Sequence, residues 1–161
     1  VLPGLRSHAV EEFGTELVSD TAPLSGMVDA LITGLGPRVH VLRDPTRGGV
    51  ASTLNEIAAS AGVGIVLDER SLPVREEVLG ACEILGLDPL YVANEGIFLA
   101  LVERQAADQA LSILRADPLG RDAVIVGEVV VDHPGTVWLK SRIGGTRVVD
   151  LLTGEQLPRI C

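Results

Sequence analysis

The sequence predicts one domain of the α/β (α+β) class, in which helices lie among strands and the last strands form an antiparallel run. Apolar residues recur at helical spacing in residues 24–35 and 50–61. Residues 97–102 are a continuous apolar run, which predicts a central strand covered on both faces. After residue 123, short apolar segments alternate with glycine and proline, as is typical of hairpins and bulges.

Composition narrows the possible functions. The chain has 161 residues, enough for one domain with a hydrophobic core, and 47% of them are apolar but only 2% aromatic. A formal net charge of −9 argues against nucleic acid or an anionic membrane surface as the main partner. No apolar run approaches the length of a membrane span. Two cysteines form no disulfide framework, so we expect a reducing, cytoplasmic location.

The first half of the chain is predicted to contain, in order, a helix, a strand, a loop, a second helix and a second strand. The first helix stops at Gly36-Pro37, and Gly62 ends the second. The two strands are expected at residues 39–42 and 63–67.

The second half is expected to contain two more helices and several short strands. One helix carries Val78, Cys82 and Leu85 on one face, so Cys82 is interpreted as a buried apolar residue without chemistry. The other has a buried stripe of Ala107, Ala110, Leu111 and Leu114. The closing strands are expected at 123–126, 129–131, 137–139 and 148–151, separated by Gly127, His133-Pro134-Gly135 and Gly144-Gly145. No histidine pair has metal-ligand spacing, so no metal site is expected in this chain.

A glycine-containing loop connects the first strand to the second helix. Its sequence is Asp44-Pro45-Thr46-Arg47-Gly48-Gly49. Asp44 or Thr46 can cap the helix, and the two glycines would leave backbone N–H groups open at the positive end of the helix dipole. That arrangement suits an anion such as phosphate, to which Arg47 could add hydrogen bonds. The alternative is an ordinary capped strand-to-helix turn.

Asn94-Glu95-Gly96 precedes the apolar run. A carboxylate beside a buried strand could serve as a general base. The alternative is a solvated glutamate in a turn.

The chain ends in Pro158-Arg159-Ile160-Cys161. Residues 152–161 have the composition of a tail, and ten residues reach roughly 30 Å when stretched. A thiol on such an arm could visit a pocket far from its anchor, with Arg159 favouring the thiolate. The alternative is an accidental surface cysteine.

Together these motifs resemble the C-terminal half of the HypE family of hydrogenase maturation proteins. The resemblance runs from about Leu17 to Cys161. It rests on the segments 19–24, 44–51 with 54–57, 87–91 with 93–96, and 158–161. The glycine loop also suits the wider aminoimidazole ribonucleotide synthetase-like superfamily, whereas the terminal Pro-Arg-Ile-Cys is specific to HypE. The resemblance implies the C-terminal domain of that superfamily, a mixed sheet flanked by helices.

The resemblance also implies chemistry on the last residue. In that family a HypF-type carbamoyltransferase carbamoylates the terminal cysteine, here Cys161. HypE then dehydrates the S-carboxamide to an S-cyanate with ATP and Mg²⁺. The cyanide passes to iron on the HypC–HypD scaffold, for the [NiFe]-hydrogenase site. Glu95 matches a motif glutamate and is the expected base. The residues expected to shape the pocket near the phosphates or the incoming tail are Asp44, Thr46, Arg47, Gly48, Gly49 and Asn94.

The family pattern is about twice as long as this chain. Residues 1–16 are therefore expected to follow a missing N-terminal ATP-binding half, with a domain at 17–151 and a flexible tail at 152–161. The missing half would supply most nucleotide and metal ligands and the contact of a homodimer, so this chain alone is expected to be inactive and to bind no cofactor. The pattern usually has Lys where this chain has Ile97. Two alternatives stay open: a non-catalytic carrier or docking module that presents Cys161 to maturation partners, and another nucleotide-using enzyme of the superfamily.

Overall fold

The computed structural model describes residues 22–151. Its α-helices are α2 (Ser25–Leu35), α3 (Gly49–Ala61), α4 (Glu76–Leu85) and α5 (Ala107–Arg115). Its strands are β1 (Val39–Arg43), β2 (Gly64–Asp68), β3 (Leu99–Val102), β4 (Gly127–Val130), β5 (Val137–Lys140) and β6 (Thr146–Val149). Short 3₁₀ turns connect several of these elements, including η3 (Pro89–Tyr91) directly before the segment that leads into β3.

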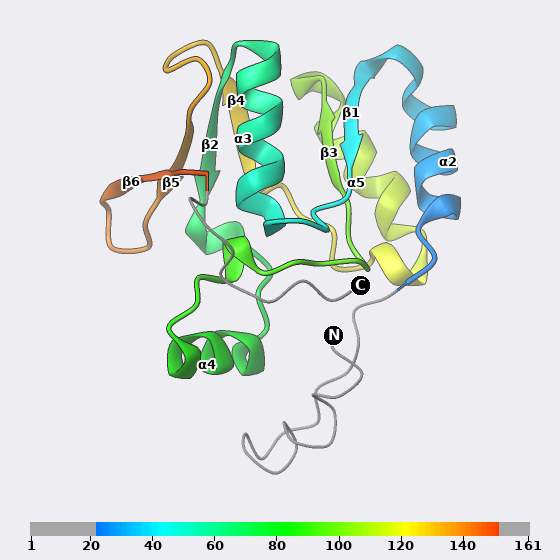
Figure 1. Cartoon of the computed structure of the whole chain (residues 1–161). Coiled ribbons are helices and arrows are strands. Elements are labelled where there is room, and N and C mark those ends of the chain that lie inside the picture. Colours follow the sequence, from blue (N-terminus) through cyan, green and yellow to red (C-terminus); the bar gives the residue numbers. More distant parts are fainter. Residues whose placement is uncertain (1–21, 152–161) are drawn as a thin grey trace.

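Helix α3 lies between two sheets (Figure 1). On one side is a four-stranded mixed sheet of order β4-β2-β5-β6, in which β2 runs antiparallel to β4 and parallel to β5. On the other side is the antiparallel pair β1-β3, and α2 and α5 cover the far face of that pair (Figure 1). The predicted α/β class with a mixed sheet flanked by helices is therefore confirmed.

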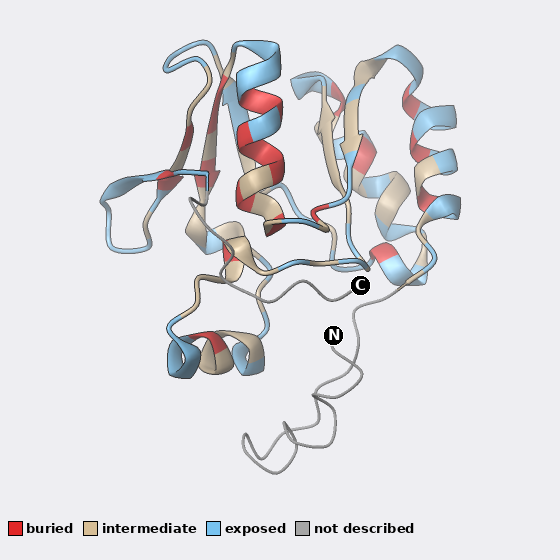
Figure 2. Ribbon diagram, in the orientation of Figure 1, coloured by how far each residue is buried: buried red, intermediate tan, exposed pale blue. Residues whose placement is uncertain are grey.

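Two apolar clusters hold these layers together, and Figure 2 shows the buried stripes on α3 and α2. The first cluster joins α3 to the four-stranded sheet, and the second joins α2 and α5 to the β1-β3 pair. Both consist mostly of small aliphatic residues, in keeping with the low aromatic content. Leu99 and Leu101 of β3 pack on the first cluster, while Ala100 and Val102 pack on the second.

The apolar run at 97–102 is thus covered on both faces, as expected, but it is not a central strand. Pairing begins only at Leu99, and β3 has β1 as its neighbour in a two-stranded sheet. Helices that pack on both faces can bury an apolar strand even where the sheet is narrow. A continuous apolar run therefore predicts that both faces of a strand are covered, but it does not predict that the strand is central in its sheet.

The expected strand at 123–126 and the break at Gly127 are wrong. Gly127 is the first residue of β4, and it faces Leu67 of β2. A Cβ at this position would collide with the Val66 carbonyl, so the glycine permits close strand approach. In the segment before it, the Ala123 carbonyl accepts two hydrogen bonds from Arg115, at 2.9 and 2.7 Å, which replace strand pairing.

The closing strands also do not form one antiparallel run. β5 and β6 are a hairpin through the predicted turn at Gly144-Gly145, but β4 and β5 lie on opposite sides of β2. The segment around His133-Pro134-Gly135 therefore crosses β2 instead of forming a hairpin. Parallel pairing of β2 with β5 is a long-range choice that glycine and proline spacing cannot predict.

Helix α4 stands apart from both clusters (Figure 1). Cys82 is buried, with 6% of its surface exposed, as predicted. Leu85, expected on the same buried face, is 57% exposed. Helix α4 packs mainly on η3, which is a short element. This small contact buries Cys82 alone and not a whole face of the helix. Burial, reinforced by Asp88, raises the pKa of the Cys82 thiol, which supports its interpretation as a residue without chemistry.

Candidate functional site

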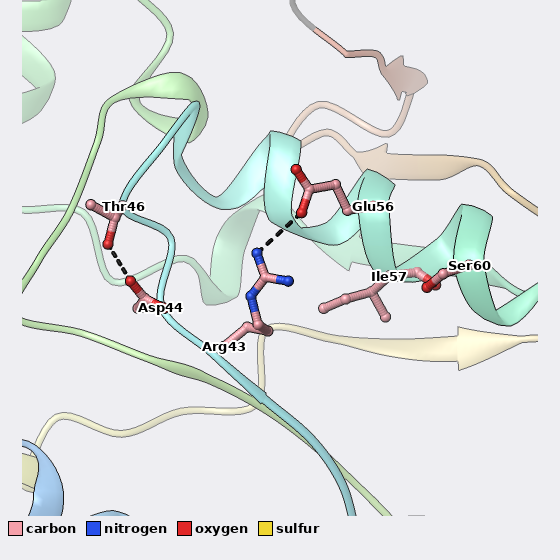
Figure 3. Close-up of polar contacts among 6 residues, drawn as sticks. All are labelled: Arg43, Asp44, Thr46, Glu56, Ile57 and Ser60. Carbon is pink, nitrogen blue, oxygen red and sulfur yellow. Dashed lines mark hydrogen bonds and ion pairs between the residues drawn. The ribbon is translucent and has the colours of Figure 1, made fainter. Parts of the chain in front are cut away.

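The loop between β1 and α3 is the first part of the candidate site. Arg43 ends β1, and its guanidinium Nη2 contacts Glu56 Oε2 of α3 at 3.1 Å (Figure 3). This ion pair spans the loop and joins the strand to the second turn of the helix. Both side chains are about half exposed, so we expect the pair to contribute well under about 1 kcal/mol.

Asp44 and Thr46 contact each other instead of capping α3. The Thr46 hydroxyl donates a hydrogen bond to the Asp44 carboxylate (Figure 3). The N-cap position belongs to Gly48, in the left-handed conformation, with no side-chain cap bond. The expectation that Asp44 or Thr46 caps the helix is therefore wrong, because the N-cap position falls on Gly48, which has no side chain to accept a hydrogen bond from the first turn.

Asp44 is an anion at neutral pH. The hydrogen bond from Thr46 is the main reason that its pKa lies below the ordinary value, and the backbone of Asp44 and the charge of Arg43 act in the same direction. The loop thus carries a carboxylate at Asp44 beside an exposed guanidinium at Arg47. A carboxylate accepts hydrogen bonds from N–H donors and repels phosphate, so the loop is not a purely phosphate-binding surface.

Gly49 is a glycine because of packing. It is buried, with φ at +64°, and a Cβ there would lie 2.7 Å from the Val92 carbonyl oxygen and closer still to that of Leu90. Gly48 also has a positive φ, and its Cβ would meet the side chain of Ser52. The sequence suggested amides open to an anion. The structure adds that the start of α3 is pressed against the 90–92 backbone and that Gly48 is half-buried.

The second part of the site is the segment that contains Asn94 and Glu95. The backbone N–H of Asn94 donates a hydrogen bond to the Pro45 carbonyl at 3.1 Å, which attaches this segment to the 44–49 loop. Asn94 also donates from Nδ2 to the Val92 carbonyl at 3.0 Å. The structure therefore brings the two predicted groups together. Glu95 is exposed, so burial beside the strand, which was the reason to expect a general base, does not apply.

A third feature ties the end of β6 to both parts. Asn55 of α3 is 7% exposed, and its Nδ2 donates to the Val149 carbonyl at 2.8 Å and to the Ala51 carbonyl at 2.9 Å. The Tyr91 hydroxyl donates to the Asp150 carbonyl at 2.9 Å. Sequence reasoning missed this anchor. The available signal was a polar residue, Asn55, on the apolar stripe of a helix.

Several predicted features lie outside the described residues. Cys161, the tail at 152–161 and the lead-in at 1–16 lie outside the described residues. Between residues 22 and 151, no group of three or more His, Cys, Asp or Glu side chains could hold a metal ion. Within the same range no helix has both the length and the apolar character needed to cross a bilayer.

These features define a domain of a known class. Residues 4–140 match the family model "AIR synthase related protein, C-terminal domain", and the chain belongs to this family. It is 55% identical, over 93% of its length, to the carbamoyl dehydratase HypE of Cupriavidus necator, of which the match covers 42%. The chain thus spans less than half the length of this curated relative.

Solved structures agree with this result. A hydrogenase maturation protein HypE in complex with ATP superimposes with a TM-score of 0.87 at 41% identity, over 98% of this chain and 48% of that one. A HypE–HypF complex gives a TM-score of 0.84 at 44% identity, over 92% and 48%. The resemblance to HypE found from the motifs is therefore confirmed.

Proposed function

We propose that this chain is the C-terminal domain of an ATP-dependent carbamoyl dehydratase that acts on its own Cys161. The observation that carries the proposal is 55% identity over 93% of the chain to a carbamoyl dehydratase HypE. In this proposal residues 1–16 follow an N-terminal ATP-binding half, residues 17–151 form the domain, and residues 152–161 are the arm that carries the thiol. The product is an S-cyanate that supplies the cyanide ligands of the [NiFe]-hydrogenase iron.

The reaction removes one water equivalent from the S-carboxamide. The amide oxygen attacks the terminal phosphorus of ATP, which releases ADP and makes the oxygen a leaving group. The C–O bond then breaks and that oxygen departs in phosphate. The nitrogen loses both protons and forms the triple bond to carbon, so the sulfur ends as S–C≡N. The carbon keeps its oxidation state, and no reductant is needed. Protein groups must accept two protons and orient the amide.

Glu95 is the proposed acceptor of the nitrogen protons. Its role as proton acceptor would depend on its position and on water exclusion once the arm is bound. Its segment is fixed to the 44–49 loop through the Asn94 amide, which gives the base a defined place. A Glu95→Gln change in the full-length protein should abolish conversion of carboxamide to cyanate while carbamoylation of Cys161 continues. Normal conversion in that variant would remove Glu95 from the mechanism.

The 44–49 loop is proposed to face the arm more than the phosphates. Asp44 is ionised and held by Thr46, so it can accept an N–H of the carboxamide and orient it. Arg47 is the exposed cation of the loop and would approach the transferred phosphoryl oxygens. Asn94 and the two glycines hold these groups in place rather than touch the reacting atoms.

ATP and Mg²⁺ are proposed to bind mainly outside this domain. A HypE relative has been solved with ATP, and the match covers 48% of that chain. The described residues offer no cluster of metal-ligand side chains, so no step is assigned to Mg²⁺ on residues 22–151. We expect this chain by itself to bind ATP weakly or not at all. Calorimetry that detects tight ATP binding by residues 1–161, lost in an Arg47→Gln variant, would contradict this arrangement.

The partners follow from the same chemistry. A relative has been solved in a HypE–HypF complex, and we propose a HypF-type carbamoyltransferase as the donor for Cys161. A HypC–HypD scaffold is the proposed acceptor of cyanide, and the full-length protein is proposed to be a homodimer in the cytoplasm.

The decisive test is intact-mass analysis of the full-length protein after incubation with HypF, carbamoyl phosphate and ATP. We expect the mass of one carboxamide on Cys161 first, then a loss of water that depends on ATP, with fragmentation placing both on the last residue. A Cys161→Ser variant is the control and should gain neither mass. Modification at another residue, or none in the wild type, would reject the proposal.

A carrier without catalysis is the second candidate, because Glu95 is exposed. In that case the domain presents Cys161 and the chemistry belongs to the other half. The two candidates differ in one measurement. Carrier function predicts an unchanged dehydration rate for Glu95→Gln, whereas the dehydratase proposal predicts loss of that step alone.

A further inference from the structure

A groove on another part of the domain is lined by arginines. Its lining includes Arg75, Arg115, Arg121 and Asp122, together with the apolar residues Pro73, Val74 and Val124. The groove measures about 440 Å³, within the range of roughly 300–1,000 Å³ that small-molecule sites occupy. It shares no residue with the 44–49 loop or with Asn94 and Glu95. We propose that this groove binds a phosphate-bearing small molecule, a role beyond the proposed dehydratase chemistry.

The charge of the groove is opposite to that of the chain. Three guanidinium groups and one carboxylate line it, in a protein with a formal net charge of −9. Asp122 already forms an ion pair with Arg121, with 3.6 Å between Arg121 Nε and Asp122 Oδ2, and both side chains are largely exposed. Asp122 offsets one of the three guanidinium charges, so the lining keeps a formal charge of 3 − 1 = +2. The groove therefore attracts anions in a protein that otherwise repels them.

Arg115 is oriented in advance. Its Nε and Nη2 both donate to the Ala123 carbonyl, at 2.9 and 2.7 Å. A guanidinium has five N–H donors, so three remain for a ligand after these two bonds. A side chain that is already held loses little rotamer freedom when an anion arrives. Arg115 also lies in the last turn of α5, where the helix dipole favours a cation, so its presence alone would have a structural explanation.

Arg75 has no such explanation. It is the N-cap residue of α4 and makes no side-chain cap bond. The N-terminus of a helix is the positive end of its dipole and favours anions. A cation there is unfavourable by itself, and within residues 22–151 the Arg75 side chain has no ion-pair partner. A bound anion would satisfy Arg75 and the helix end together. Glu76 and Glu77 follow in the first turn of α4 but do not line the groove.

Arginine favours phosphate over a simple halide because its planar fork donates two parallel hydrogen bonds to oxyanions. Carboxylates offer the same geometry with less charge, so a diphosphate group should bind more tightly than a dicarboxylate. The apolar lining residues Pro73, Val74 and Val124 could contact the body of a phosphate ester. A free diphosphate and a nucleotide share this chemistry, and their relative affinities distinguish the two sources.

The test is calorimetric titration of the 161-residue chain with sodium diphosphate at low ionic strength, with ADP and succinate as parallel probes. We expect one saturable site for diphosphate, weakened by added salt, and weaker binding of succinate. Arg75→Gln and Arg121→Gln should each reduce the affinity by about three- to tenfold, since each removes a charge-assisted contact. ADP binding that exceeds diphosphate binding would identify a nucleotide as the source, and the reverse order a free phosphate compound.

Two matched variants make the result specific. Arg142→Gln removes the same charge from an exposed residue in the β5–β6 turn and should leave the affinity unchanged. Arg47→Gln removes a cation from the candidate dehydratase site and should also have no effect. Absence of saturable binding, an equal loss in Arg142→Gln, loss only in Arg47→Gln, or succinate binding as tight as diphosphate would each overturn the groove proposal. None of these outcomes affects the mass test of the proposed function. Circular dichroism of every variant checks that the fold is retained.

Discussion

Gly49 is the position where a single methyl group should do most damage to the candidate site. Its φ of +64° places it in the left-handed region, and its Cβ position is occupied by backbone atoms of residues 90–92. A Gly49→Ala change therefore has two costs. The left-handed conformation costs a residue with a Cβ about 1–2 kcal/mol, and forced overpacking costs about 1–3 kcal/mol more. We expect a total destabilisation of about 2–5 kcal/mol.

Gly62 provides the matched control, because it ends the same helix. It also has φ +64°, but nothing lies within 4 Å of its Cβ position. Gly62→Ala should therefore cost only the conformational part, about 1–2 kcal/mol. Gly80, inside α4 with open space around it, should instead gain about 0.4–1 kcal/mol as alanine.

Urea denaturation of the 161-residue chain, followed by far-UV circular dichroism, measures all three variants. The difference between Gly49→Ala and Gly62→Ala isolates the contact with residues 90–92. If the two variants lose the same stability, the start of α3 is not pressed against that segment, and the arrangement of the candidate site described above is wrong. If Gly49→Ala loses more, the full-length variant should also lose dehydration activity, because the two parts of the site are forced apart.

Three further predictions concern individual side chains. Asn55→Ala leaves the buried Val149 carbonyl without its donor and should cost about 1–3 kcal/mol in urea denaturation; a cost near zero would contradict the anchoring of β6. Thr46→Val removes the main cause of the lowered Asp44 pKa, so an NMR titration should find that pKa raised. Because the folded-state pKa is depressed, the stabilisation from Asp44 is present above its unfolded pKa and is lost as the pH falls through the folded value. The variant should show a weaker pH dependence, since the backbone and Arg43 still lower the pKa. Cys82, buried and with a raised pKa, should resist iodoacetamide at pH 8 until urea unfolds the chain; alkylation at the rate of a free thiol in native buffer would refute this.

Local structure was predictable here because local residues decide it. The bounds of α2 and α3 follow from apolar spacing and from Gly36 and Gly62, which end them in the structure as in the prediction. Cys82 was placed correctly by its helical face. What could not be predicted depends on distant partners. Gly127 is typical of a break, and only the approach of Val66 explains it as a strand residue. The parallel pairing of β2 with β5 depends on contacts about seventy residues apart.

The candidate site divides in the same way. The two glycines after Arg47 were recognised as special, and the structure adds a packing reason for Gly49, the closeness of residues 90–92. A positive φ suits both an anion loop and a packed turn, so glycine alone cannot distinguish them. Asn55 was part of a recognised motif, yet its partner on β6 lies 94 positions away. A polar residue on an apolar helical stripe indicates a buried partner without identifying it.

The anchoring of β6 explains how one domain could serve a thiol at its end. Val149 is held to α3 by Asn55, and Asp150 is held to the 89–91 turn by Tyr91. The same helix begins at Gly49, and the same turn leads to Asn94 and Glu95. The residues that directly precede the last ten of the chain are therefore attached to the two elements that frame the candidate site. Ten residues span at most roughly 33–36 Å, and a short tether gives an effective concentration in the millimolar range. In the proposed function, this reach would let Cys161 serve both the enzyme and its partner through movement of residues 152–161 alone.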